Sequence, residues 1–294
     1  MANPPESHRH HYVPEGLLSS WERKNSSNQN LVLAYQWDTF QRKVVIVSRS
    51  TKSFCWEKDL NSLIRHPMGR DALETQFFGP IDDKGLAAKQ VLIDGGLNAL
   101  TNQQRQDFCI FLMSLRARRP EVIAKLRTDG AAILIDGLDT DTQISQVLNE
   151  QGISDKASVH YEKITQTSIQ DRAQLNVQKL ILNEAVGKIL INANWGVYSL
   201  RGNSSFMLSD EPLVTLGKYD SPQAMWLLPL GPKHLFYAAN FIKDAKNIST
   251  SRSDILAKKM NIDSISQADK FVFSISDNCH NLVEECWRKT GHIT

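Results

Sequence analysis

The spacing of the apolar residues predicts a short helix near the start of the chain. Leu17, Leu18 and Trp21 recur at helical spacing, and Pro14 precedes them at a position where a first helical turn tolerates proline. We therefore expect a helix within residues 14–24.

A period of two replaces the helical spacing in the next stretch. Residues 30–37 and 43–48 are rich in β-branched and aromatic residues, and a short connection that begins at Asp38 separates them. This arrangement predicts a β-hairpin. Residues 54–56 continue the pattern and predict a third strand.

The middle of the chain, residues 70–193, has apolar residues at intervals of three and four, as amphipathic helices do. Gly79 and Pro80 predict a break in the first of these helices. Thr101 and Gln104 have the spacing of a capping box, in which the threonine hydroxyl accepts an early backbone N–H and the glutamine reaches back. A helix is therefore expected to begin after Thr101.

Two further features divide the helical stretch. Pro120 predicts that a helix bends or restarts there, because proline has no N–H and its ring clashes with the carbonyl four residues earlier. Residues 139–142 superficially resemble a calcium loop but lack its glycine and terminal glutamate, so we interpret them as a helix cap. A long helix is expected over residues 170–193.

After residue 193 the period returns to two, which predicts a β-rich section. The expected strands are 195–200, 205–208, 225–230, 234–239 and 271–276, and the expected helices are 253–260 and 266–270. The first four strands follow one another without helical patterns between them, which favours an antiparallel sheet. The predicted fold class is α+β, with a helical middle section packed on a mainly antiparallel sheet built from N- and C-terminal strands.

Composition favours a single domain. The chain has 294 residues, of which 41% are hydrophobic and 22% charged, as in an ordinary globular protein, and no Pro-rich or Gly/Ser-rich linker interrupts it. The expected single domain, 1–294, consists of a flexible segment at 1–9, a helix plus hairpin at 10–60, a helical section at 70–193, a β-rich section at 194–276 and a tail at 277–294.

Charge, cysteine content and motifs exclude several classes of protein. A formal net charge of +2 does not indicate a surface that coats nucleic acid, and the four cysteines lack the spacing of a zinc site or a disulfide scaffold. Without a signal-like or membrane-spanning apolar stretch, we expect a cytoplasmic protein with no membrane segment. P-loop, Rossmann, GxSxG and HExxH motifs are absent, and the sequence does not reveal the oligomeric state.

His10 and His11 are the first candidates for chemistry. Neighbouring residues of an extended segment point to opposite sides, so only one of the two imidazoles is expected to take part in a site. In the alternative interpretation, one ring packs and forms hydrogen bonds while the other is exposed, which is the commoner role.

Asp210 is the second candidate. The apolar run before it reads as a strand and Pro212 ends that strand, which places the Asp210 carboxylate at a strand end. A carboxylate in this position can bind a divalent ion or act as a general base. An aspartate before a turn more commonly accepts hydrogen bonds from backbone N–H groups.

These residues resemble the motifs of the bacterial family known as domain of unknown function 4238. Members begin with His-His-x-x-Pro and a helix of leucine and aromatic residues, as His10, His11 and Pro14 do here. A middle helix of the family carries a glutamate, matched by Glu74, and a later one carries Arg-Thr-Pro, approximated by residues 118–120.

The family pattern continues in the second half of the chain. Residues 206–212 match Phe-x-x-Ser-Asp-x-Pro, and residues 229–232 approximate Pro-Leu-Ser-Pro. The resemblance extends over residues 10–276. Arg119 and Gly231 replace hydroxyl residues of the family, so this chain lacks a hydroxyl group at these two positions. The resemblance implies a component of phage-defence loci, of an effector or toxin class.

The resemblance also suggests a set of candidate catalytic residues, which are His10, His11, Glu74, Arg118 and Asp210. If they converge, His11, Glu74 and Asp210 would form a nitrogen and oxygen ligand set for Mn²⁺ or Mg²⁺, and Arg118 would neutralise a phosphate. The ion would polarise a phosphodiester and lower the pKa of bound water. A metal-free site would use a histidine as general acid or base.

A competing interpretation gives the same residues structural roles. Asp210 would cap a turn, Glu74 and Arg118 would form a buried pair between helices, and a histidine would fix the N-terminal segment to the sheet. The two interpretations differ in what a structure must show.

Three function classes follow. The first is a phage-defence effector that hydrolyses nucleic acid or nucleotides, and it predicts a concave, positive pocket containing His11, Arg118 and Asp210. The second is a non-catalytic sensor or adaptor that binds a phage component or a protein partner; it predicts these residues buried and paired, with an exposed apolar patch elsewhere. The third binds a small anion without turnover.

Overall fold

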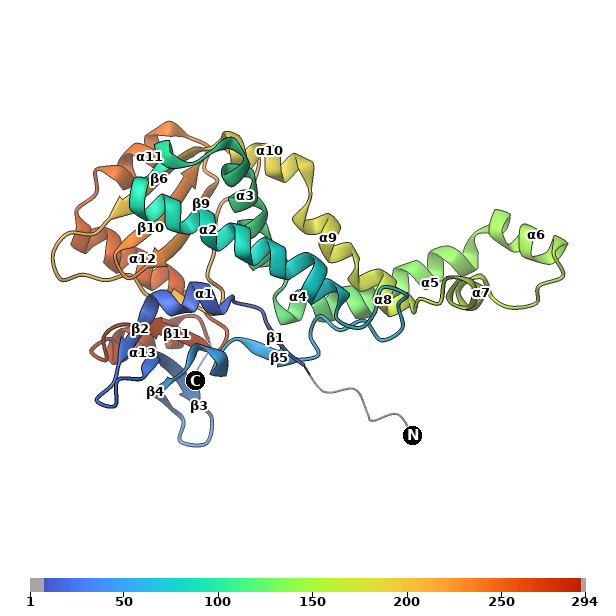
Figure 1. Cartoon of the computed structure of the whole chain (residues 1–294), viewed down its shortest axis with the longest axis horizontal. Coiled ribbons are helices and arrows are strands. Elements are labelled where there is room, and N and C mark those ends of the chain that lie inside the picture. Colours follow the sequence, from blue (N-terminus) through green and yellow to red (C-terminus); the bar gives the residue numbers. More distant parts are fainter. Residues whose placement is uncertain (1–7, 292–294) are drawn as a thin grey trace. The chain divides into compact units, whose positions relative to one another are not determined.

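The computed structural model describes residues 8–291, and Figure 1 shows the chain. The contacts divide it into two compact units. The described residues of unit 1 lie within Met1–His10, Glu57–Ile81 and Ala117–Asn183, and those of unit 2 within His11–Trp56, Asp82–Arg116 and Glu184–Thr294. Each unit thus combines segments that are far apart in the sequence.

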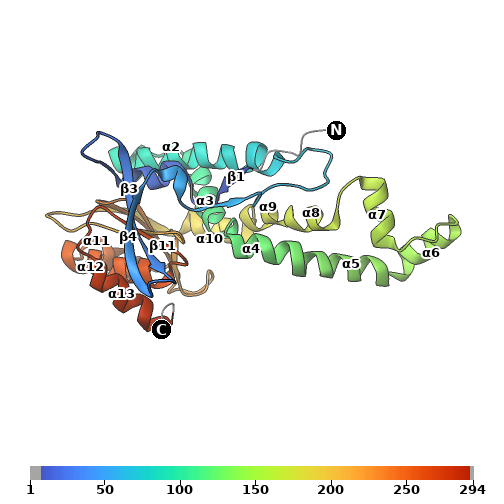
Figure 2. The same cartoon turned by 90° about the horizontal axis from the view of Figure 1, so that it is seen from below.

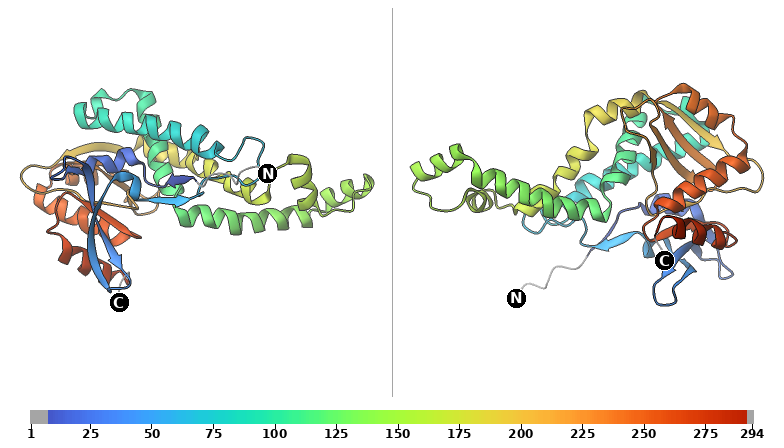
Figure 3. Two further views of the ribbon diagram at one scale, coloured as in Figure 1. Left: turned by 60° about the horizontal axis from the view of Figure 1, so that its bottom comes forward. Right: turned by 180° about the vertical axis from the view of Figure 1, so that it is seen from behind.

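Unit 2 contains a four-stranded antiparallel sheet with the order β6-β10-β9-β8. Strands β9 and β10 lie side by side in Figure 3 and form a hairpin with a register shift at its turn, between His234 and Leu235. The strands are β6 (Asn194–Ser199), β8 (Val214–Leu216), β9 (Met225–Gly231) and β10 (His234–Ala239).

A second, five-stranded antiparallel sheet of unit 2 joins the two ends of the sequence. Strand β3 pairs with β2, β4 and β11, and β11 also pairs with β7. The strands are β2 (Glu22–Lys24), β3 (Asn30–Asp38), β4 (Lys43–Arg49), β7 (Leu208–Ser209) and β11 (Phe271–Ser274). A separate two-stranded sheet pairs β1 (Arg9–His11) with β5 (Trp56–Lys58).

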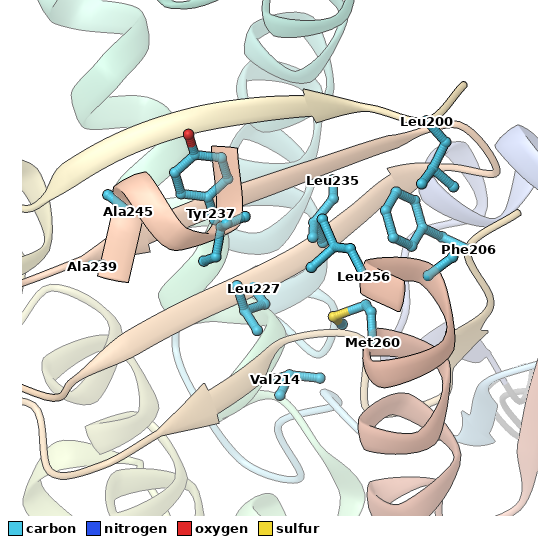
Figure 4. Close-up of a cluster of buried hydrophobic side chains, with 12 residues drawn as sticks. Leu200, Phe206, Val214, Leu227, Leu235, Tyr237, Ala239, Ala245, Leu256 and Met260 are labelled. Carbon is cyan, nitrogen blue, oxygen red and sulfur yellow. The ribbon is translucent and has the colours of Figure 1, made fainter. Parts of the chain in front are cut away.

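Helices of unit 2 cover these sheets with apolar faces. Figure 4 shows Leu256 and Met260 of α12 (Ser253–Gln267) packed against Leu227 and Leu235 of β9 and β10. This burial of aliphatic side chains removes apolar area from water and stabilises the sheet. The remaining elements of the unit include α1 (Glu15–Leu18), η1 (Ser19–Trp21), η2 (Thr51–Ser53), η4 (Leu97–Ala99), α10 (Glu184–Asn192), α11 (Ile242–Ser249), α12 (Ser253–Gln267) and α13 (His280–Lys289).

Two long helices belong to unit 2 for most of their length, namely α2 (Gly79–Gly95) and α3 (Asn102–Ala117). They approach closely at Gly85, where a Cβ atom would lie 2.2 Å from Cγ of Phe111. A residue larger than glycine at this position therefore requires the helices to move apart.

Unit 1 is mainly helical. Helix α5 packs beside α8, and α6 and α7 pack against α5 and against each other (Figures 1 and 2). Ala131, Ile169 and Ala173 form the small core between these helices. The elements are π-helical η3 (Leu73–Phe78), α4 (Pro120–Lys125), π-helical η5 (Leu126–Gly130), α5 (Ala131–Thr140), α6 (Thr142–Glu150), α7 (Ala157–Thr165), α8 (Ile169–Gln174) and α9 (Asn176–Ile181).

The structure confirms the predicted fold class. The chain is α+β, with 51% helix and 19% strand, helices in its middle and antiparallel sheets built from N- and C-terminal strands. The hairpin at 30–48 forms as predicted. Thr101 and Gln104 exchange both hydrogen bonds of the capping box, and Asp141 caps α6 by accepting two backbone N–H groups.

Several element boundaries were predicted wrongly. The helix does not break at Gly79 and Pro80, because the π-helical segment η3 continues directly into α2, whose second residue is Pro80. The long helix expected over 170–193 is divided into α8, α9 and α10. The opening helix ends at Trp21, because Glu22–Lys24 pairs with β3. Of the segment expected to be flexible, residues 1–7 lie outside the described residues.

Other elements were not indicated by the spacing of apolar residues in the sequence. Strand β8 and helices α11 and α13 were not predicted, and the two helices expected within 253–270 form the single helix α12. The third predicted strand begins only at Trp56, because Cys55 has a left-handed backbone conformation with φ of 54°. Such a conformation interrupts a strand at a residue other than glycine.

Candidate functional site

His10 is fixed inside unit 1 by a hydrogen bond to its ring. The side chain is buried, and Nδ1 accepts the backbone N–H of Asn61 over 2.8 Å. Burial, the largest cause, lowers the pKa of His10 below its ordinary value. The imidazole is therefore neutral near pH 7, with its hydrogen on Nε2.

Asn61 connects His10 to Glu74. Nδ2 of Asn61 donates to Oε2 of Glu74 over 2.8 Å, and the Asn61 side chain is 0% exposed. Glu74 lies in the π-helical segment η3, a type of distortion that occurs often at functional sites. The amide oxygen Oδ1 of Asn61 has no hydrogen-bond partner among the described residues.

Charged residues surround this connection. Nε2 of His8 lies 3.7 Å from Oδ2 of Asp71, and the His8 ring stacks on that of His10 with 6.2 Å between centroids. Asp59 accepts the backbone N–H of His8 and pairs with Arg70 over 2.9 Å. The hydrogen bond from His8 and then the Arg70 guanidinium hold the pKa of Asp59 below its ordinary value.

The tautomer of His10 limits its chemistry. Because Nδ1 accepts an N–H, the ring offers Nε2–H as a donor and has no lone pair left for a metal ion or a proton. In the described part of the chain, no three His, Cys, Asp or Glu side chains are placed to hold a metal ion together. The arrangement suits hydrogen bonding to a polar ligand.

Arg118 belongs to the same unit and contacts the same helical segment. Its side chain is buried, and the guanidinium carbon lies 5.6 Å from the ring centre of Phe78, within the range of a cation–π interaction. Phe78 ends η3, the segment that carries Glu74. Three of the residues predicted for a site, His10, Glu74 and Arg118, are thus parts of unit 1.

Asp210 lies in unit 2 directly after β7 and is 1% exposed. Its two carboxylate oxygens accept the backbone N–H groups of Asp269 and Lys270 over 2.9 and 2.7 Å. Burial raises the pKa of Asp210 to about 7, although these hydrogen bonds oppose the shift. The carboxylate fixes the turn between α12 and β11.

His11 and Tyr12 continue the chain within unit 2. Nδ1 of His11 lies 3.6 Å from Oε1 of Glu15, one helical turn further on. The backbone N–H of Tyr12 donates to the carbonyl of Cys55, and burial raises the pKa of the Tyr12 hydroxyl above its ordinary value. The five predicted residues are therefore divided, three in unit 1 and His11 and Asp210 in unit 2.

Asn61 was not predicted from the sequence as a site residue, although it contacts both His10 and Glu74 in unit 1. One of these contacts uses its backbone N–H, and no sequence pattern reports a backbone donor. Asp71 was missed as well, although its position three residues before Glu74 at a helix start was visible.

Lys89 is a further titratable residue that the sequence did not single out. It is buried in unit 2, and its ammonium group donates to Oγ of Ser20 over 2.7 Å. Burial lowers its pKa to about 8. The lysine joins α2 to η1 and has the character of a structural anchor.

Comparison with known families assigns the chain. A model of the family described as protein of unknown function (DUF4238) matches residues 9–278, which is most of the chain. The chain belongs to this family, as its motifs predicted. Neither a curated protein nor a solved structure matches it. Among the described residues, no helix is both long and apolar enough to cross a membrane.

Proposed function

We propose that the chain is a non-catalytic sensor or adaptor in phage defence, and that it binds a protein partner through helices α5, α6 and α7 of unit 1. The defence role comes from the family resemblance. The binding role is supported by the burial of His10, Arg118 and Asp210 and by the local hydrogen bonds of His10 and Asp210, whereas aliphatic side chains of α5–α7 are exposed.

The docking surface consists of aliphatic side chains that project into solvent. Solvent-exposed helix faces are normally polar, so several exposed aliphatic residues on three neighbouring helices indicate an interaction surface. Its members are Ile133 on α5, Val147 on α6, and Val159 and Ile164 on α7. We call this set the α5–α7 surface.

A groove adjoins this surface at the end of α7. Its volume is about 480 Å³, and Ile64, Arg65 and Glu162 are among the residues that line it. The buried carboxylate of Asp171 accepts the backbone N–H groups of Ile64 and Arg65, which fixes the wall opposite α7. The groove is therefore a preformed feature of unit 1 that can receive a side chain of a partner.

Charge identifies the kind of partner. Residues 131–165 contain six acidic residues and only two basic ones. The basic ones are Lys156 and Lys163, and the acidic ones are Asp136, Asp139, Asp141, Glu150, Asp155 and Glu162. This excess of negative charge repels nucleic acid phosphates and attracts a basic protein surface. The proposed occupant is therefore a protein with basic residues around an aliphatic patch.

A phage challenge tests the proposal in bacteria. Cells that express the wild type are compared with cells that express the Ile133→Ser, Ile164→Ser double variant. We expect protection by the double variant to be at least tenfold weaker than protection by the wild type, because two aliphatic contacts with the partner are removed. Ile255→Ser is the matched control, since Ile255 is 56% exposed on unit 2.

The outcome separates the proposal from its alternatives. Protection by the double variant equal to that of the wild type would exclude the α5–α7 surface. Absence of protection by the wild type against a broad phage panel would contradict the defence role. Circular dichroism of the purified double variant must match that of the wild type, so that a loss of protection is not a loss of folding.

A second candidate function is hydrolysis of nucleic acid or nucleotides. The connection of His10 to Glu74 through Asn61 favours it, because it places a carboxylate general base and an imidazole N–H donor in one cluster. In this candidate Glu74 activates water and His10 donates to the developing negative oxygen.

Purified protein tests the second candidate. It is incubated with single- and double-stranded DNA, RNA and nucleoside triphosphates, with Mn²⁺, with Mg²⁺ or with EDTA, because the sequence predicts an ion of this class. Glu74→Gln keeps a hydrogen-bond acceptor for Asn61 and removes the base, so we expect it to abolish any true activity. Activity that survives in this variant belongs to a contaminant.

A further inference from the structure

Strand β6 forms one edge of the four-stranded sheet of unit 2, with β10 on one side and no described strand on the other. An edge strand presents backbone N–H and C=O groups with which a further strand can pair, and proteins usually protect such edges. In the two larger sheets, the edge strands β8, β2 and β7 have only three, three and two residues, and β4 begins and ends with a charged residue. Strand β6 has six residues, none of them charged and none proline. It is therefore the described edge best suited to accept another strand.

The register of β6 determines which of its backbone groups are open. The N–H of Leu200 donates to the carbonyl of Lys233 over 2.8 Å, and β6 and β10 keep this register along their length. In an antiparallel pair, alternate residues bond to the neighbouring strand and the residues between them point away. The N–H and C=O groups of Val197 and Ser199 therefore point to the outer edge, where no described residue bonds to them.

A groove adjoins this edge. Its volume is about 630 Å³, and its walls are residues 197–201 on one side and residues 249–253, between α11 and α12, on the other. A volume of this size is typical of ligand-binding pockets. Ser199 and Arg201 on the first wall and Ser249 and Thr250 on the second are exposed, so a ligand reaches the groove directly from solvent.

The hydroxyl groups of the second wall already donate their hydrogens. Those of Ser249 and Thr250 donate to the carbonyl of Lys246, and that of Ser251 donates to the carbonyl of Asn247. Because a hydroxyl has one hydrogen, these groups cannot also donate to an anion such as phosphate. The groove offers instead the alternating donors and acceptors of β6, which the backbone of another strand satisfies.

The side chains of β6 determine what a pairing strand contacts. Leu200 shares a core cluster with Tyr237, on the sheet face shown in Figure 4. Tyr198 lies two residues before Leu200 and points to the same face, where its hydroxyl group donates to the carbonyl of Ser251 over 2.6 Å. A residue opposite Tyr198 on an added strand also points to this face. Its side chain therefore enters the groove.

Two arginines provide the charge of the groove. Arg252 forms an ion pair with Asp254 over 2.8 Å, whereas the exposed guanidinium of Arg201 pairs with no acidic side chain of the described residues. An acidic side chain beside Arg201 would gain a charge-assisted hydrogen bond. We propose that an extended segment of a partner protein pairs with the outer edge of β6 and places an acidic residue against Arg201.

Fluorescence anisotropy with two labelled hexapeptides tests the proposal. In Glu-Val-Thr-Val-Thr-Val the glutamate lies beside Arg201 if the added strand is antiparallel to β6, and in Val-Thr-Val-Thr-Val-Glu it does so if the strand is parallel. Both ends are blocked, and fluorescein is attached at the end remote from the glutamate. We expect one of these peptides to bind saturably, and its counterpart with lysine in place of glutamate to bind at least tenfold more weakly. Failure of both glutamate peptides to bind would overturn the proposal.

Methylation of peptide nitrogens tests the strand pairing itself. Methyl groups are placed on the second and fourth residues of the peptide that binds, or on its third and fifth residues. In a paired strand, one of these sets of N–H groups faces β6 and the other faces away. One methylated peptide should bind at least tenfold more weakly and the other about as tightly as the parent peptide. Equal binding of the two methylated peptides would exclude strand pairing.

Variants of the protein locate the peptide on β6. Ser199→Pro removes one outward N–H and keeps the bonds to β10, which an edge strand tolerates, and Ser199→Ala is the matched control. We expect Ser199→Pro alone to weaken binding at least tenfold. Arg201→Glu should make the lysine peptide bind more tightly than the glutamate peptide, which provides a second test if Ser199→Pro folds poorly. Arg42→Glu, between β3 and β4, should leave the preference for glutamate unchanged. An unchanged preference in Arg201→Glu would overturn the pairing with Arg201.

Sedimentation equilibrium distinguishes a partner protein from a second copy of this chain. We expect the wild type to be monomeric without peptide. A dimer that Ser199→Pro dissociates would overturn the proposal, because β6 would then pair with a second copy. The edge of β6 lies in unit 2 and does not include the α5–α7 surface, so the Ile133→Ser, Ile164→Ser variant must bind the glutamate peptide like the wild type.

Discussion

The backbone N–H of Asn61 donates a 2.8 Å hydrogen bond to Nδ1 of His10 within unit 1. This contact determines which nitrogen of the imidazole carries hydrogen. It also gives the first histidine of the His-His-x-x-Pro motif a structural role. The ring anchors β1 to the segment that begins after β5. It also orders the residue that contacts Glu74.

Replacing His10 by alanine is expected to destabilise unit 1. The substitution leaves the Asn61 N–H buried without an acceptor, which costs about 1–3 kcal/mol. Urea unfolding measures the change in the free energy of unfolding. His160→Ala, a substitution on α7, is the control and should change it by less than about 0.5 kcal/mol. A His10→Ala protein as stable as the wild type would show that this hydrogen bond does not contribute to the stability of unit 1.

The same residue predicts a dependence of stability on pH. Burial lowers the folded-state pKa of His10 below 6.5, so in acid the unfolded chain binds a proton that the folded chain does not. The contribution of His10 is complete above pH 6.5 and is lost as the pH falls below that value. His10→Gln should flatten this part of the curve of unfolding free energy against pH. Parallel curves for both proteins would contradict the assignment of a neutral, buried ring.

The raised pKa of Asp210 predicts a dependence of stability on pH that is opposite in sign to that of His10. Its folded-state pKa is about 7 and its ordinary value is 3.8, so between these values the folded protein holds a proton that the unfolded chain has released. This contribution is greatest in acid and is lost as the pH rises through about 7. The unfolding free energy of the wild type relative to Asp210→Asn should fall over this window by at most about 1.4 kcal/mol per pH unit. A difference that does not vary with pH would mean that Asp210 is ionised throughout.

Two glycine substitutions test the packing of the helices. Gly137 lies in α5, and a methyl group added there would meet no heavy atom within 4 Å, so Gly137→Ala should stabilise the protein by about 0.5–1 kcal/mol and preserve protection against phage. Gly85→Ala places a methyl group against Phe111 and should cost about 1–3 kcal/mol. Thermal unfolding compares the two variants. Stabilisation by Gly85→Ala would contradict the close approach of α2 and α3.

The sequence predicted those parts of the fold that local patterns determine. The hairpin at 30–48, the capping box at Thr101 and the cap at Asp141 depend on residues close together in the chain, and all three form as predicted. Strand β2 depends instead on pairing with β3, which overrides the helical spacing of Glu22–Lys24. The π-helical turns of η3 and η5 also have no local signature.

The candidate site was predictable only in part. Motif resemblance singled out His10 and Glu74, which Asn61 connects in space. It did not reveal Asn61, because the residue acts through its backbone and through an amide that matches no motif. The competing interpretation predicted that Asp210 accepts backbone N–H groups, and the structure shows two such hydrogen bonds. The sequence did not reveal that their donors, Asp269 and Lys270, lie in the distant turn between α12 and β11.

Photo-crosslinking in infected cells tests the proposed docking surface most directly. A photoreactive amino acid is placed at position 164 on α7, or at position 255 on unit 2 as the control, because both isoleucines are largely exposed. We predict a crosslink from position 164 to one basic protein, which disappears when Asp136→Lys and Glu150→Lys reverse the local charge. No crosslink from position 164, or the same crosslinks from position 255, would contradict partner binding through α5–α7.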